Sequence, residues 1–266
     1  MAFCRAFERS ISSPAVSVHE EAKAGAAPQL DLGATMEAVQ ELAAKVGFSP
    51  EVREFTKANV LKTINEIKKQ PRLNAILSRL NRNRDKYISN HSMLLAHLAC
   101  ALAAEMEWKS ETTYHKLTLA AFLHDIAIAN EDLARFNTLK ELGARLLAEP
   151  TAFTPEEVAA FKQHPVKAAE IARLFDEVPP DVDVILLQHH ERPDGSGFPR
   201  GLTHTWISPL TAVFIVAHDL VQFILEMPKG APFDEAAIQE FLGKHKEEYG
   251  FSNFKKATEG IRRIRI

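Results

Sequence analysis

Apolar residues recur along most of this chain at the three- and four-residue spacing of amphipathic helices. The spacing is clear over about residues 35–46 and 50–69, and again in the segment that follows residue 154. No stretch shows the alternation of apolar and polar residues that a half-buried strand produces. The pattern therefore predicts an all-α protein.

Signals for helix ends agree with this prediction. Thr154-Pro-Glu-Glu157 has the form of a capping box with proline at the first helical position, and Ser208-Pro209 has the form of a second helix start. The tail from residue 232 to 266 predicts two amphipathic helices that separate near Tyr249-Gly250.

Composition divides the chain into three predicted parts. Residues 1–34 are rich in Ser, Pro and Ala and are predicted to be a flexible or irregular N-terminal segment. Residues 35–80 are predicted to form a small helical accessory region, and residues 81–266 the main helical domain. The basic stretch 72–86 is interpreted as a solvated helix face and linker in preference to a phosphate-facing patch.

Charge and cysteine content exclude several classes of protein. A net charge of -3 and a pI near 6.4 argue against binding to a nucleic acid polymer or a membrane surface. Only Cys4 and Cys100 occur, so neither a disulfide framework nor a thiolate zinc site is indicated. No apolar run approaches the roughly 20 residues that span a bilayer. We therefore expect a cytoplasmic protein.

Two polar residues interrupt an apolar run that otherwise predicts a buried helix. The run covers residues 117–129, and His124 and Asp125 stand inside it. An unpaired carboxylate there carries a desolvation penalty of several kcal/mol or becomes neutral. Two explanations remain open from the dipeptide alone, a hydrogen-bonded His-Asp pair and a metal site.

Further histidines and a carboxylate are expected to point inward. His91 shares a helical stripe with Leu94 and Leu98, and Asp219 lines up with Ile215 and Phe223 at helical spacing. His164 precedes Pro165, which biases it away from regular helix and predicts a kink or junction.

The pair His189-His190 runs directly into a glycine-rich turn that ends at Leu202. Adjacent imidazoles form one wall of a metal site, and the turn brings Arg192, Asp194 and Arg200 near it to hold an anionic substrate. Histidine and carboxylate donors without thiolate suit iron, manganese or zinc.

The order of these motifs resembles the HD-GYP domain, a branch of the HD superfamily of metal-dependent phosphohydrolases. The resemblance covers about residues 85–225 and is carried by His91, His124-Asp125, His164-Pro165, His189-His190-Glu191 with the turn from Asp194 to Leu202, and Asp219. It implies an HD-type helical bundle and two divalent metal ions, iron first and manganese or zinc as alternatives. One ion would be held by His91, His124, Asp125 and Asp219, and the other by His164, His189 and His190, with Asp125 as the bridge. The implied reaction is hydrolysis of a cyclic di-GMP phosphodiester by a hydroxide activated between the metals.

Several positions depart from the family pattern. The lysine of His-Asp-x-Gly-Lys is Ile128, and the tyrosine of Gly-Tyr-Pro is Phe198. Tyr87 stands where some members carry a glutamate for a third metal, and Val213 and Gln222 replace an arginine and an aspartate of the last helix. These changes leave the expected metal ligands intact while removing groups that approach the substrate.

Two functions therefore stay open. The first is a cyclic di-GMP phosphodiesterase, in which Arg192, Arg200 or Lys167 partly replaces the lost lysine. The second is a degenerate, metal-bearing domain that senses a cyclic dinucleotide or docks on a signalling protein. Phe198 is either a core plug under the turn or a platform on which a guanine base stacks.

Two neighbours of the ligands are expected to support them without binding metal. His218 projects about 100° away from Asp219 on a helix. Glu191 is expected to orient ligating imidazoles, as carboxylates beside metal sites do.

Overall fold

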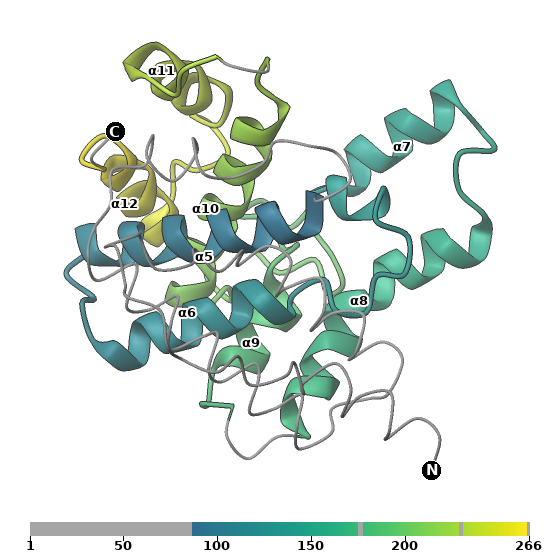
Figure 1. Ribbon diagram of the computed structural model, residues 1–266, viewed down its shortest axis with the longest axis horizontal. Helices are drawn as coiled ribbons and strands as arrows, with labels where there is room; N and C mark the ends of the chain where they lie inside the picture. Colours follow the sequence, from purple (N-terminus) through teal and green to yellow (C-terminus); the bar gives the residue numbers. More distant parts are fainter. Residues whose placement is uncertain (1–86, 175–177, 229–230, 265–266) are drawn as a thin grey trace, which may run out of the picture. The chain divides into compact units, whose positions relative to one another are not determined.

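The computed structural model describes residues 87–174, 178–228 and 231–264, so the predictions for residues 1–34 and 35–80 lie outside the described residues. The described residues form eight α-helices, one 3₁₀ helix and no strand, which confirms the all-α prediction (Figure 1). The elements are α5 (Tyr87–Glu105), α6 (Glu111–Leu123), η2 (Leu133–Arg135), α7 (Leu139–Ala148), α8 (Pro155–Arg173), α9 (Val182–Gln188), α10 (Pro209–Glu226), α11 (Glu235–Lys244) and α12 (Ser252–Ile261).

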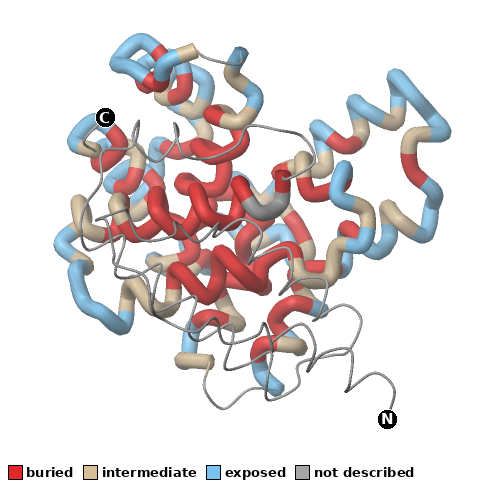
Figure 2. The backbone as a smooth tube through the Cα atoms, viewed as in Figure 1, coloured by how far each residue is buried: buried red, intermediate tan, exposed pale blue. Residues whose placement is uncertain are grey.

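The core lies where α5 packs against both α6 and α10. Leu94 and Leu98 of α5, Leu117 of α6 and Phe214 of α10 are all enclosed there. Figure 2 shows buried residues concentrated along these three helices, whereas most of α7 is exposed. Burying such side chains stabilises the fold by about 1.5–3 kcal/mol each.

The predicted helix starts are confirmed. Thr154 and Glu157 form the capping box of α8 with Pro155 at the first position, and the Ser208 hydroxyl accepts from the Thr211 N–H at the start of α10. The predicted pair of C-terminal helices corresponds to α11 and α12, with Gly250 between them.

Helix α10 is the central element of the core. By length and composition it is the one helix in the described part of the chain that could cross a membrane, yet 72% of it is buried inside the protein. Its buried residues run from Thr211 to Gln222 without a break. Its apolar character is therefore explained by packing against protein.

Candidate metal centre

Seven buried side chains from separate helical elements gather in two groups of potential metal ligands. Within each group the ligand atoms lie within 4.8 Å of one another. The first, here called the Asp125 group, contains Asp125, His164, His189 and His190. The second, the His91 group, contains His91, His124 and His218.

The Asp125 carboxylate lies between the two groups. One oxygen, Oδ2, is 3.0 Å from Nε2 of His124, and the other, Oδ1, is 3.5 Å from Nε2 of His164. Nε2 of His164 is in turn 3.1 Å from Nε2 of His189. The two groups therefore meet at one carboxylate that faces both.

Helix ends orient two of the imidazoles. Helix α6 ends at Leu123 and α9 at Gln188, so the predicted helix over 117–129 stops earlier than expected, and His124 and His189 occupy the C-cap positions. The last carbonyls of a helix have no partner in a following turn. Nδ1 of His124 lies 3.0 Å from the Ala121 carbonyl, and Nδ1 of His189 lies 2.6 Å from the Leu186 carbonyl. Donation from Nδ1 leaves the lone pair of each Nε2 facing the centre.

His164 is oriented in the same way within a continuous helix. Helix α8 runs through Pro165, so the expected kink or junction is wrong. Proline has no N–H for the carbonyl four residues earlier, which is that of Phe161. That carbonyl lies 2.5 Å from Nδ1 of His164 instead. Pro165 thus leaves an acceptor that holds its neighbour's ring.

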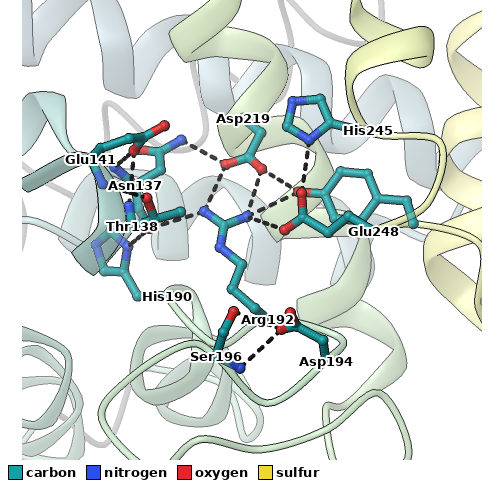
Figure 3. Close-up of polar contacts among 11 residues, drawn as sticks. Asn137, Thr138, Glu141, His190, Arg192, Asp194, Ser196, Asp219, His245 and Glu248 are labelled. Carbon is teal, nitrogen blue, oxygen red and sulfur yellow. Dashed lines mark hydrogen bonds and ion pairs between the residues drawn. The ribbon is translucent and has the colours of Figure 1, made fainter. Parts of the chain in front are cut away.

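His190 takes its acceptor from a distant part of the chain. It follows α9, and its Nδ1 lies 2.9 Å from the carbonyl of Asn137, which precedes α7 (Figure 3). Its ring stacks on Phe198 with centroids 4.5 Å apart. His190 is therefore fixed by contacts with segments far from it in the sequence.

The buried nitrogens of this compartment fit bound metal ions. Both ring nitrogens of His91 and His218, and Nε2 of His190, have no hydrogen-bond partner among the described residues. Buried polar atoms are nearly always satisfied, so these nitrogens call for a ligand. Neutral imidazole nitrogen is a common donor to first-row metals.

Protonation states agree with this fit. Burial lowers the pKa of His91 to about 3 and that of His164 to about 4, so both rings stay neutral at pH 7. Burial alone would raise the pKa of Asp125, but His124 and His164 together lower it below its usual range. The neutral rings of His91 and His164 thus lie in the same compartment as one ionised carboxylate.

The structure does not bring Asp219 together with His91 and His124. His218, which precedes it on α10, takes that place. The Asp219 carboxylate instead accepts from Arg192 at 2.6 Å and from the Asn137 amide at 2.7 Å, and Tyr249 donates to it as well (Figure 3). The expectation that Asp219 is a ligand and His218 a supporting residue is thus reversed in this arrangement.

The expected substrate contacts divide into exposed and buried residues. Arg200 and Lys167 are exposed, whereas Arg192 is only 2% exposed and paired with Asp219. Phe198 is 5% exposed and packs on Phe161, which places it in the core under the turn.

Two carboxylates shape the glycine-rich turn. Asp194, which was expected near the substrate, is exposed and accepts from both the backbone N–H and the hydroxyl of Ser196. Glu191 is fully buried and accepts the backbone N–H groups of Arg200 at 2.8 Å and Leu202 at 2.7 Å. Among the described residues the Glu191 carboxylate thus binds the backbone of the turn, and not an imidazole as expected.

The positions that depart from the family pattern are filled by local packing. Tyr87 stacks on His91 with centroids 5.5 Å apart and donates to Gln222. Ile128 packs against a small apolar cluster that includes Phe161 and Phe198.

Sequence reasoning missed Asn137 and Tyr249 as residues of this region. Neither lies in a recognisable motif, and both reach the site only through tertiary contacts.

Comparisons with known proteins identify the family of this chain. Residues 75–250 match the family model of the HD domain. A cyclic di-GMP phosphodiesterase of Thermotoga maritima is 32% identical over 174 residues, which cover 64% of this chain and 44% of that protein. The cyclic di-GMP phosphodiesterase response regulator RpfG of Xanthomonas campestris is 32% identical over 185 residues, covering 66% of this chain and 43% of that protein. The chain thus spans less than half the length of these two relatives.

A solved structure has the same fold. An HDG"Y"P protein from Bdellovibrio bacteriovorus superposes with a TM-score of 0.58 at 22% sequence identity, and the match covers 90% of this chain and 75% of that one.

Proposed function

The chain belongs to the HD domain family, and on this premise we propose that it is a member of the HD-GYP branch and a metal-dependent phosphohydrolase that cleaves cyclic di-GMP. One observation carries the proposal. Six histidines and one aspartate from five helical elements share a compartment in which none is more than 4% exposed. The names of the similar proteins support the choice of substrate.

The Asp125 group and the His91 group would each hold one divalent ion, with Asp125 as the bridge. Six imidazoles and a single carboxylate suit iron or zinc better than manganese, and do not suit magnesium or calcium. Two such ions supply an activated water and offset negative charge on phosphoryl oxygens.

The exposed cations Arg200 and Lys167 are the proposed contacts to the substrate phosphates. Arg200 lies on the turn that Glu191 holds, and Lys167 follows His164 by one turn of α8. Arg192 is not among them, because its guanidinium is buried and paired.

A second candidate function is a degenerate, metal-bearing domain that senses a cyclic dinucleotide or docks on a signalling protein. The observation that favours it is the apolar packing of Ile128, which leaves no cation where the family has its lysine. Binding without turnover is the expected behaviour of such a domain.

The two functions are separated by incubating iron-, zinc- or manganese-loaded protein with cyclic di-GMP and measuring linear dinucleotide and GMP. Product from the wild-type protein, lost in Asp125→Asn and retained in Asp183→Asn, supports the hydrolase. Asp183 is a suitable control because it pairs with Arg173 outside the centre. Binding of cyclic di-GMP without product under any of these metals would favour the sensor function over the hydrolase. Measuring product from Ile128→Lys would then test whether the missing cation is the cause of inactivity.

A further inference from the structure

A buried cluster of polar residues lies beside the metal centre. It consists of Arg192, Asp219, Tyr249 and Asn137, here called the Arg192 cluster. Figure 3 shows Arg192 between Asp219 and Asn137. The guanidinium pairs with Asp219 in a fork, with Nη1 2.6 Å from Oδ2 and Nη2 3.1 Å from Oδ1. It also donates to the Tyr249 hydroxyl at 3.0 Å and to the Asn137 carbonyl at 2.9 Å.

The cluster is sealed from solvent. Arg192, Tyr249 and Asn137 are each 2% exposed, and Asp219 is 6% exposed. A substrate phosphate therefore does not reach the guanidinium in this structure. Charges buried so deeply are tolerated only with close partners, which fixes the positions of all four side chains relative to one another.

A metal ion does not explain the cluster. The potential ligand atoms of Asp219, His245 and Glu248 lie within 4.8 Å of one another, which alone would suggest a third site. The guanidinium already provides the positive charge there, since its Nη1 is 2.6 Å from Asp219 and 3.5 Å from Oε1 of Glu248. A cation added between them would meet this charge at close range.

The link to the centre is the Asn137 carbonyl, which accepts from Arg192 and from Nδ1 of His190, each at 2.9 Å. The N–H of Thr138, which belongs to the same peptide group as this carbonyl, donates to the Glu141 carboxylate at 3.0 Å, so the peptide is held on both sides. His124, His164 and His189 use a carbonyl three residues earlier in their own helix. His190 has no such local acceptor among its described contacts and depends on one that lies 53 residues away.

We propose that the Arg192 cluster is a positioning device for His190, and that Tyr249, which lies between α11 and α12, is a working part of it. The proposal rests on the proposed function only in taking the Asp125 group as a metal site. Arg192 and Asp219 then act through the Asn137 carbonyl and touch neither metal nor substrate.

The test measures metal affinity, so its result does not depend on whether the protein hydrolyses cyclic di-GMP. Tyr249→Phe removes one donor to Asp219 and one acceptor from Arg192 while keeping the ring, and Asp219→Asn breaks the charge pair. Tyr114→Phe on α6 makes the same chemical change outside the cluster and serves as the control. Removing outer partners of a ligand typically weakens metal binding about 10- to 100-fold. In Tyr249→Phe we expect this loss of affinity for one of two cobalt ions, together with a changed cobalt absorption spectrum. The circular dichroism of this variant should stay native, and Tyr114→Phe should bind both ions as the wild-type protein does.

Wild-type affinity and spectrum in folded Tyr249→Phe would overturn the proposal. Equal weakening of both ions would also overturn it, because it indicates general loosening of the fold. If the wild-type protein itself binds no ion, the failure lies with the proposed function.

Discussion

A single methyl group added at Gly197 is expected to disrupt the turn that carries His190. An ideal Cβ at this position would lie 2.4 Å from the Arg192 backbone nitrogen, 2.4 Å from the His190 carbonyl oxygen and 2.5 Å from Cα of Glu191. Ordinary van der Waals contact begins at 3.4 Å, so this backbone would have to retreat by about 1 Å.

The energetic cost follows from what would have to move. All three obstructing atoms belong to the main chain, which is less able to yield than the end of a side chain. Overpacking typically costs about 1–3 kcal/mol, and we place Gly197→Ala at the upper end, about 3 kcal/mol. A displacement of this size would also carry His190 out of the Asp125 group, so loss of bound metal should accompany the loss of stability.

Gly143 provides the matched control. It lies within α7, and a Cβ there meets nothing within 4 Å. Because alanine is favoured over glycine in a helix by about 1 kcal/mol, Gly143→Ala should stabilise the protein. Urea unfolding of the metal-free variants measures both changes, and elemental analysis counts the ions retained. Gly197→Ala with wild-type stability and a full metal content would refute this account of the turn.

Three further predictions concern stability. Glu191→Gln puts an amide donor against one of two backbone N–H groups, so urea unfolding should show a loss of about 1–3 kcal/mol; no loss would mean that the carboxylate does not hold the turn. Metal-free protein should lose stability as pH falls from about 6.5 to 4, because the pKa of His164 is lowered to about 4 and the unfolded chain binds more protons in that window. His164 alone accounts for about 3 kcal/mol, and a flat stability profile over this range would contradict its neutral burial. Metal at 100 times its dissociation constant should raise the unfolding free energy by about 2.7 kcal/mol per independent site, detected as a higher melting temperature than with chelator; an unchanged melting temperature would argue against binding to the folded state.

The sequence predicts much of this region because its signals are local. His124 and Asp125 break an apolar run, and that break marks them as buried polar residues wherever the helix ends. The capping box at Thr154 and the N-cap at Ser208 depend on neighbouring residues alone, so they are readable without tertiary structure.

The exchange between Asp219 and His218 was not readable in this way. Helix α10 is buried on every side from Thr211 to Gln222, so periodicity does not tell which of two adjacent polar residues faces the ligands. Which of the two residues faces the ligands depends on Arg192, a residue of another segment that pairs with Asp219 and neutralises its charge. Pro165 is a similar case. Proline locally predicts a helix break, but helix α8 continues, and the Phe161 carbonyl that proline leaves without a backbone partner contacts Nδ1 of His164.

Two differences from the family pattern offset each other in charge, namely His218 in the place expected for Asp219 and Ile128 in the place of a lysine. With His218 in the place expected for Asp219, the two ligand groups contain one carboxylate, Asp125, and six imidazoles. Burial holds the pKa of His218 well below its usual value, so its ring is neutral where a second carboxylate would carry a negative charge. The proposed centre, when loaded with divalent ions, is therefore one unit more positive than a centre with a second carboxylate. The lysine that Ile128 replaces would have contributed the same single positive charge. Attraction for an anionic diester can thus be retained at the metals themselves, which is why the absence of the lysine alone does not argue against hydrolysis.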